Sequence, residues 1–214
     1  ISVISLVSTL GVTVGVMALI LALALMTGLQ QELRDRILGA TAHVFVWKQG
    51  GIRDVRADAD AIAAIPHVAG AAPAVLGKAL VSSAAGEAFI TIKGIDPALE
   101  PSVTNVGTAI RSGSLAALAP SDEDARPGIV IGVDLAKSLG VYDGDEVTVL
   151  TPQGTLTPMG VTPRSRRLRV VGQFQLGLFE FDSAYGFVSL PTARRLMNRD
   201  DVEVLEVRVD DIYR

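Results

Sequence analysis

The N-terminal segment of this chain carries no charged residue from Ile1 to Gln31. Folded as an α-helix, the apolar stretch ending at Leu29 would be about 43 Å long, whereas the hydrocarbon core of a bilayer is roughly 30 Å thick. The segment is therefore predicted to be a transmembrane helix. A secretory signal peptide is the alternative, although its apolar region is shorter. Because the chain does not begin with methionine, we expect it to be part of a longer protein.

One face of this predicted helix is made of small residues. They recur at spacings of three and four, at Ser8, Gly11, Gly15, Ala18 and Ala22. A small-residue stripe lets two helices approach closely within a membrane, so we expect it to pack against a partner helix. A lone anchor that faces only lipid is the alternative.

The helical pattern continues beyond the apolar segment. One apolar face extends to Ile37, Glu32 and Arg36 are spaced for an i,i+4 ion pair, and Gly39 suits a helix end. We therefore expect the helix to leave the bilayer as a stalk that can transmit movement, which a flexible Gly/Ser linker would not. Residues 1–39 are assigned to the transmembrane helix and stalk, and 40–214 to a separate domain.

The remaining residues are predicted to form a mixed α/β domain, so the fold class of the chain is α+β. Alternating apolar and polar residues predict strands at 42–47, 75–83, 88–96, 167–174, 185–190 and 202–209. Helical spacing predicts helices at 54–65 and 191–198. The stretch 128–150 is predicted to form a strand, a helix, a turn and a second strand. The loop-rich stretch 97–127 is a candidate boundary between two subdomains.

Composition and motifs argue against several functions. The net charge of −4 argues against nucleic-acid binding, and the absence of cysteine excludes disulfides and thiolate metal sites. His43 and His67 match no metal-binding motif, so structural roles are expected for both. Acidic residues cluster in predicted loops and turns and near the chain end, and no nucleophile or phosphate-binding motif occurs. We predict no catalytic site, metal or cofactor.

The stretch LTPMGVTPRSRRLR, residues 156–169, is the most unusual feature of the domain. Pro158 and Pro163 have no N–H to donate, so the stretch is predicted to be a loop that projects from a hairpin rather than continued strand pairing. The prolines restrict the backbone, Met159 offers an adaptable apolar tip, and Gly160 leaves room for close approach. These properties suit a preorganised binding loop. A mobile hairpin tip is the alternative.

Four arginines follow this loop. On a strand, Arg164 and Arg166 share one face, and Arg167 and Arg169 share the other. The first pair is predicted to form a basic pad beside the loop. Solvated surface charges are the alternative.

Two longer stretches resemble a known family. LALALMTGLQQELRDRILGATAHV is similar to the first transmembrane helix and exit segment of LolC/LolE-type lipoprotein-releasing ABC permeases, and GIVIGVDLAKSLGVYDGDEVTVL resembles part of their extracytoplasmic domain. The resemblance runs along the whole chain and is partly shared with the wider MacB-like permeases. TPMGVTPRSRR looks like the hook with which LolC-type subunits bind a chaperone.

The resemblance implies a transport subunit without an ATPase site, anchored in the inner membrane, with a MacB-like domain in the periplasm. Its implied partners are a cytoplasmic LolD-type subunit that binds ATP, a second permease subunit that is identical or homologous, the periplasmic chaperone LolA, and the lipoprotein substrate. Two other interpretations stay open. One is a MacB-like permease that moves another substrate or transmits force, and the other is a membrane-anchored periplasmic sensor or binding module.

The resemblance also implies roles for particular residues. The hook would enter the lipid-binding cavity of LolA or its mouth, and Arg164 and Arg166 would contact the rim. The hook residues are Pro158, Met159, Gly160, Val161, Thr162 and Pro163. Leu25, Met26 and Leu29 lie at the outer end of the predicted membrane helix, where bulky flexible side chains can meet acyl chains, so they are predicted to line the lipoprotein path. Ordinary helix packing is the alternative for these three.

Overall fold

The computed structural model describes residues 2–52, 54–119, 126–157, 160–199 and 201–212. Contacts divide the chain into two units, Ile1–Leu38 and Gly39–Arg214. The first unit is helical, and the second contains the whole β-sheet.

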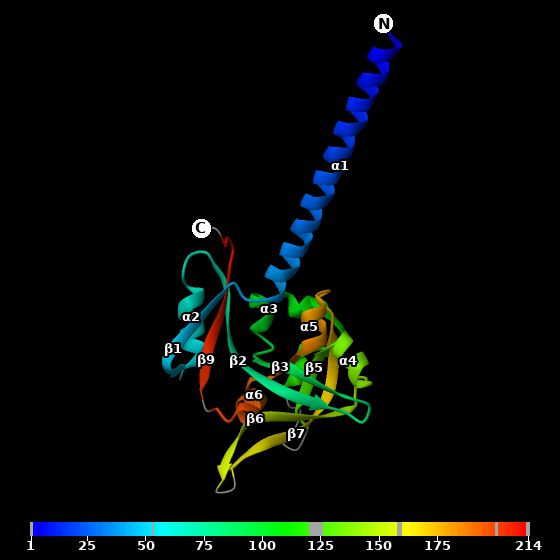
Figure 1. Ribbon diagram of the computed structural model, residues 1–214. Helices are drawn as coiled ribbons and strands as arrows, with labels where there is room; N and C mark the ends of the chain where they lie inside the picture. The colour runs from blue at the N-terminus through cyan, green and yellow to red at the C-terminus, as the bar shows by residue number, and fades with distance from the viewer. Residues whose placement is uncertain (1, 53, 120–125, 158–159, 200, 213–214) are drawn as a thin grey trace. The chain divides into compact units, whose positions relative to one another are not determined.

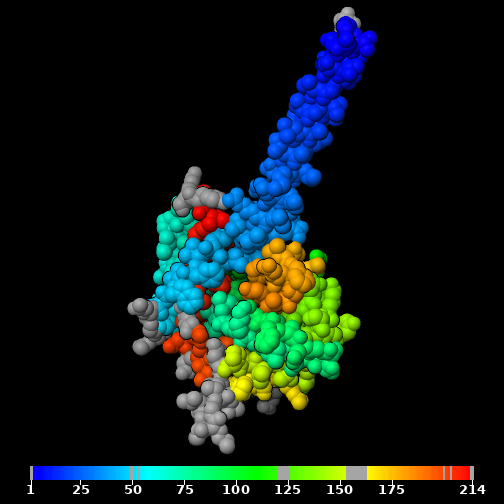
Figure 2. All heavy atoms as spheres, viewed as in Figure 1, coloured from blue at the N-terminus to red at the C-terminus, as the bar shows by residue number. Residues whose placement is uncertain are grey.

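Helix α1 is one unbroken helix from Val3 to Ala40. At 38 residues it is about 57 Å long, and it is long and apolar enough to cross a membrane. Its large apolar side chains are exposed in the described structure; Figure 2 draws this helix in blue. The predicted ion pair is confirmed, with Arg36 Nε 2.7 Å from Glu32 Oε1. The predicted continuation of the helix beyond the apolar segment is confirmed as well.

The described residues of the second unit form a nine-stranded mixed sheet (Figure 1). The strand order is β1-β9-β2-β3-β8-β5-β7-β4, and β6 pairs with β2 and β7. Strands β3 and β8 are parallel, as are β5 and β7, and the other pairs are antiparallel. The strands are β1 Val44–Ile52, β2 Val68–Ser82, β3 Glu87–Ile95, β4 Ile110–Gly113, β5 Gly128–Gly132, β6 Glu146–Thr157, β7 Gly160–Phe174, β8 Tyr185–Ser189 and β9 Val202–Val209.

Short helices cover both faces of the sheet. They are α2 Val55–Ala63, α3 Glu100–Val103, α4 Val133–Leu139, α5 Phe179–Ala184 and α6 Leu190–Met197, with 3-10 turns η1 Asn105–Ala109 and η2 Leu115–Leu118. In β5, Ile129 and Ile131 join the larger core cluster with residues of α4 and α6, whereas Val130 joins a second cluster with residues of η1 and η2. Because neighbouring strand residues point to opposite faces, the two clusters lie on opposite sides of β5.

The sequence predicted the main elements correctly, and the mixed α/β fold is confirmed. The short elements α3, α5 and β4 and the 3-10 turns η1 and η2 were missed, since four to six residues carry too little periodicity to be recognised. The proposed division into subdomains within 97–127 stays a prediction.

The prediction of an open loop around the hook was wrong in part. Strand pairing continues outward through Thr155 with Thr162 to Thr157 with Gly160. Pro158 and Met159 connect the strands and lie outside the described residues. Pro163 is tolerated in β7 because it falls at the register shift between Thr151 and Thr155 of the partner strand, where no paired N–H is required.

Candidate functional site

The hairpin of β6 and β7 extends beyond the rest of the sheet (Figure 1). Strand β7 pairs with β5 only from Arg169 onward, and the pairing of β6 with β2 covers Thr148–Leu150. Among the described residues, the outer part of the hairpin is therefore paired only within itself. A two-stranded arm held by its own ladder can reach a partner without disturbing the core.

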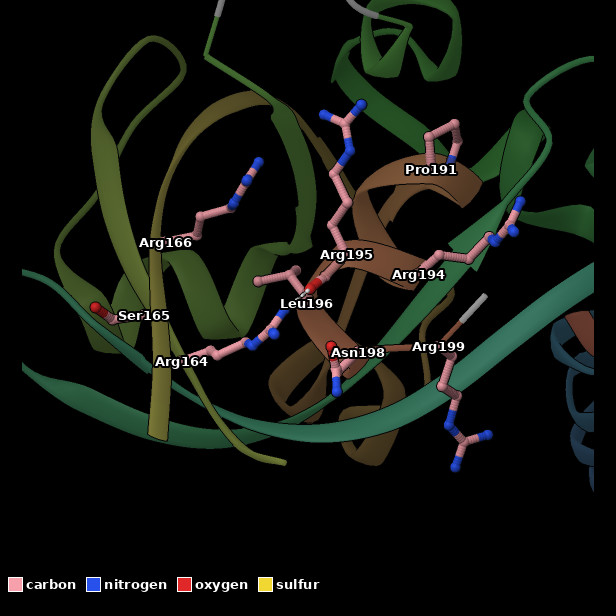
Figure 3. A pocket seen from close by; sticks show the side chains of 9 residues that line it. All are labelled: Arg164, Ser165, Arg166, Pro191, Arg194, Arg195, Leu196, Asn198 and Arg199. Atoms are coloured by element: carbon pink, nitrogen blue, oxygen red, sulfur yellow. Dashed lines mark hydrogen bonds between the residues drawn. The ribbon is translucent and has the colours of Figure 1, made fainter. Parts of the chain in front are cut away.

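A basic hollow lies beside the base of this arm, between β7 and α6 (Figure 3). We call it the arginine hollow; it has a volume of about 570 Å³. Arg164 and Arg166 project from β7 toward α6, and Arg195 extends from α6, whereas Arg194 and Arg199 turn away from β7. The lining residues are Arg164, Ser165, Arg166, Pro191, Arg194, Arg195, Leu196, Asn198 and Arg199.

The local sequence explains how α6 presents these arginines. Pro191 lies in the first turn, where its missing N–H costs no helical hydrogen bond, and Asn198 ends the helix with φ of 52°. The apolar residues Leu196 and Met197 are buried in the core. Basic side chains are left on the outer face near the helix C-terminus, where cations are favoured by the helix dipole.

Two hydrogen bonds attach α6 to the hairpin. The buried Thr151 hydroxyl of β6 donates to the Leu196 carbonyl at 2.9 Å. Arg164 Nη1 donates to the Arg195 carbonyl at 3.4 Å. Both acceptors lie in the last turn of α6. These two hydrogen bonds therefore fix α6 against the base of the hairpin, and the two elements form the walls of the arginine hollow.

A second charged cluster is buried inside the domain. Lys93 Nζ of β3 donates to Glu100 Oε1 of α3 at 2.8 Å and to Glu206 Oε2 of β9 at 2.6 Å. The Thr104 hydroxyl donates to the same Glu100 oxygen at 2.8 Å. All three charged side chains are less than a tenth exposed. The cluster holds one positive and two negative groups, so its charges do not balance when all are ionised.

Burial and the neighbouring charges shift the pKa values of Glu206 and Lys93. Burial raises the pKa of Glu206, and the nearby Glu100 carboxylate adds to the rise while the Lys93 ammonium opposes it. Burial alone would lower the pKa of Lys93, but the two carboxylates raise it above its ordinary value. The folded state therefore binds protons more tightly than the unfolded chain at both sites.

The pH dependence of the free energy of unfolding should reveal the raised pKa of Glu206. Since its folded pKa is raised, its stabilising contribution is present below the ordinary value of 4.5 and is lost as pH rises through the raised pKa. The wild type should thus lose stability relative to Glu206→Gln between about pH 5 and about pH 8, by at most about 1.4 kcal/mol per pH unit. Chemical unfolding of both proteins at the two pH values measures this difference. A relative gain on raising the pH would contradict the assignment.

Comparison with known proteins identifies the domain. Residues 5–212 match the MacB-like periplasmic core domain. The chain belongs to this family. It is 36% identical to the lipoprotein-releasing system transmembrane protein LolC of Xylella fastidiosa, over 99% of this chain and 50% of that protein. It is 33% identical to LolC of Neisseria meningitidis, over 97% and 49%.

More distant similarities extend along most of the chain. LolE of Haemophilus influenzae is 24% identical over all of this chain and 51% of its own length. The extracellular domain of the ABC-type transporter YknZ from Gram-positive bacteria shares the fold, with a TM-score of 0.50 and 12% identity over 78% of this chain and 82% of the other. The chain spans about half the length of the curated relatives it matches.

In this MacB-like protein the predicted membrane contacts all lie on α1. Leu25, Met26 and Leu29 are exposed in the described structure. At Gly11 and Gly15, apart from the adjoining residues and the backbone of the helix itself, no described atom lies within 4 Å of the position a Cβ would occupy. The roles of both sets stay predictions.

The histidines of the domain contact the end of β9. His43 Nδ1 lies 3.2 Å from the Val209 carbonyl oxygen and 3.3 Å from its nitrogen. His67 Nδ1 lies 3.2 Å from Asp210 Oδ2. These contacts support the structural roles expected for both.

Sequence reasoning found only one wall of the arginine hollow. It placed Arg164 and Arg166 together but missed Arg195, because residues on a distant helix share no local pattern with β7. It also missed Lys93, Glu100 and Glu206. A charged residue within an otherwise apolar stretch of sequence was the available signal for Lys93.

Proposed function

We propose that the chain is part of a permease subunit of an ABC transporter that releases lipoproteins from the inner membrane and transfers them to a LolA-type chaperone. The main support is the 33–36% identity to LolC proteins along nearly the whole chain. A helix of membrane-crossing length followed by a MacB-like periplasmic core domain agrees with this assignment. These observations favour lipoprotein release over a permease for another substrate and over a membrane-anchored sensor.

The proposed division of work follows from the two units. Helix α1 crosses the inner membrane, and the small-residue stripe packs it against other helices. Leu25, Met26 and Leu29 contact the lipoprotein acyl chains. The second unit lies in the periplasm. A separate LolD-type subunit binds and hydrolyses ATP in the cytoplasm, and a second permease subunit, identical or of the LolE type, completes the pathway. This subunit itself needs no cofactor.

The hairpin tip is proposed to bind the chaperone. The observed pairing up to Thr157 and Gly160 makes the arm more preorganised than an open loop would be. A preorganised arm loses less conformational entropy on binding. In this proposal Met159 of the segment Pro158–Pro163 supplies an apolar group for the lipid-binding cavity or its mouth, and Arg164 and Arg166 contact the rim.

Replacing the tip tests this function. In the double variant Pro158→Asn with Met159→Gly, the new Asn-Gly pair suits a two-residue hairpin connection, so the strand pairing should survive. Burying a methionine contributes about 1.5–3 kcal/mol, so affinity for LolA should fall roughly 10- to 100-fold. Binding is measured with the full-length permease in nanodiscs. ATP-driven transfer of lipoprotein from proteoliposomes to LolA should fall in parallel.

A conservative tip variant provides the control. Met159→Leu keeps an apolar side chain of similar size, so affinity and transfer should stay close to those of the wild type. If the Asn-Gly variant bound and loaded LolA as well as the wild type, the chaperone-binding role of the hairpin would be wrong.

A further inference from the structure

We propose that a recess beside Lys93 and Glu206 binds the ammonium group of a lysine side chain from a protein partner. We call it the aromatic recess; its volume is about 70 Å³, and all the residues that line it belong to the second unit. It shares no lining residue with the arginine hollow. Its ligand is therefore bound independently of the hairpin and of LolA.

The walls of the recess are aromatic. Side chains from β1, α5 and β8 form them, namely Phe45, Phe181, Tyr185 and Phe187. The rings of Phe181 and Tyr185 are stacked, with centroids 4.8 Å apart. The Lys93 ammonium lies 6.0 Å from the centroid of the Phe187 ring. Aromatic faces carry partial negative charge and attract cations, so these walls suit a second ammonium group as well.

The charges at the recess leave room for one more cation. Lys93 and Glu206 line it, and Glu100 accepts from the same ammonium without lining the recess. Glu206 uses Oε2 for Lys93, and Glu100 Oε2 is buried with no partner among the described residues. Two carboxylates beside one ammonium leave one negative charge unbalanced when all three are ionised. A second cation would balance it and reduce the cost of burying the cluster.

The volume of the recess restricts the ligand to a small group. A water molecule takes up about 30 Å³ in the liquid, so about 70 Å³ admits two or three non-hydrogen atoms. The end of a lysine side chain has this size, whereas the planar guanidinium of arginine is larger. Lysine methylenes can contact the aromatic walls while the ammonium group reaches Glu206.

The position of the recess favours a protein lysine over the amine of a phospholipid headgroup. Ala40 lines the recess and follows Leu29, the end of the apolar stretch, by 11 residues. That is about 16 Å along α1, and about 12 Å above the hydrocarbon even if the helix tilts by about 40°. Headgroups extend only about 5–8 Å beyond the hydrocarbon. A lysine on a periplasmic protein segment reaches the recess without leaving the aqueous phase.

Protonation of Glu206 competes with the ligand. The groups that face this carboxyl are Lys93 of β3, Glu100 of α3 and the Tyr185 phenol of β8, and Arg208 follows it on β9. Burial raises the pKa of Glu206, and the Glu100 carboxylate adds to the rise. A proton on Glu206 removes the negative charge that attracts the ammonium. Affinity should therefore rise as pH increases through the raised pKa.

Ethylammonium serves as a probe for the tip of a lysine side chain. Because a ligand of three non-hydrogen atoms rarely binds more tightly than about 1 mM, we expect a Kd of about 1–10 mM at about pH 8. The Kd is measured from the rise in Tm of the full-length protein in detergent, relative to NaCl at equal concentration. Binding should be at least about threefold weaker at about pH 5. Ethanol, a neutral molecule of the same size, should give no such rise.

Two variants and their matched controls test the residues. Glu206→Gln should weaken ethylammonium binding about tenfold or more and abolish its pH dependence, whereas Glu87→Gln, on an exposed part of β3, should stay within about twofold of the wild type. Phe45→Leu keeps an apolar side chain but removes a ring of the recess, so binding should weaken about two- to fivefold. Phe89→Leu makes the same change at an exposed position outside the recess and should have no effect.

Nanodiscs distinguish the two sources of the ammonium group. Ethylammonium should bind equally well in phosphatidylethanolamine and phosphatidylcholine nanodiscs if the natural ligand is a protein lysine. Weaker binding in phosphatidylethanolamine alone would show that the lipid headgroup competes, and would overturn the lysine assignment. Equal stabilisation by ethanol and ethylammonium, or wild-type affinity in both Glu206→Gln and Phe45→Leu, would overturn the site itself. Each of these results leaves the proposed function standing, because none of the measurements involves LolA or a lipoprotein.

Discussion

Replacing Lys93 by methionine is expected to lower the free energy of unfolding by about 3–5 kcal/mol, because breaking a buried ion pair leaves uncompensated charge in the interior. Lys93 is bonded to both Glu100 and Glu206, so two buried carboxylates would lose their cation together. The loss should be larger at about pH 8 than at about pH 5, since carboxylates that take up protons need no counterion. Chemical unfolding in detergent, followed by fluorescence, measures it.

The single tryptophan is well placed for this measurement. Trp47 of β1 pairs with Val204 of β9, two residues from Glu206. Its emission should therefore report unfolding of the strands that surround the cluster.

Two variants serve as controls for Lys93→Met. Lys78→Met removes a lysine that donates to the Thr91 hydroxyl at 2.7 Å and has no carboxylate partner among its described contacts, so it should cost less than about 1 kcal/mol. Combining Lys93→Met with Glu100→Gln and Glu206→Gln removes all three charges and should restore most of the lost stability. A loss below about 1 kcal/mol for Lys93→Met alone would show that the cluster is not a stabilising unit.

Inserting two alanines after Gln31 is expected to abolish lipoprotein transfer while the protein still folds. Each helical residue turns the chain by about 100°, so the insertion rotates the two ends of α1 by about 200° relative to each other. If α1 transmits movement as a rigid stalk, the domain then meets its partners with the wrong face. Transfer of lipoprotein from proteoliposomes to LolA gives the readout, and the unfolding transition of the domain reports folding.

An insertion of four alanines separates rotation from length. It lengthens α1 by about 6 Å instead of about 3 Å, but its net rotation is only about 40°. Transfer should thus be better preserved with four added residues than with two. Equal, normal transfer in both variants would show that α1 is only a tether.

Local sequence patterns predicted those parts of the fold that depend on nearby residues. Hydrophobicity at helical spacing identified α1 and its continuation to the stalk, and the Glu32–Arg36 pair followed from their spacing. Period-two patterns and Pro or Gly boundaries predicted most strands and helices of the domain. These features are decided within one element, so a single sequence carries them.

The tertiary structure alone decided the features that join distant residues. Pro158 and Pro163 argued for an open loop, but strand pairing persists because Pro163 falls at a register shift that only the partner strand reveals. Lys93 and Glu206 are 113 positions apart, and they meet because β3 and β9 both flank β2. Arg195 joins Arg164 because hydrogen bonds hold α6 against the hairpin. The sequence by itself determined most helices and strands and the charged side chains that each of them carries. Burial and long-range strand pairing determined which of those side chains meet, because no local sequence period encodes contacts between distant elements.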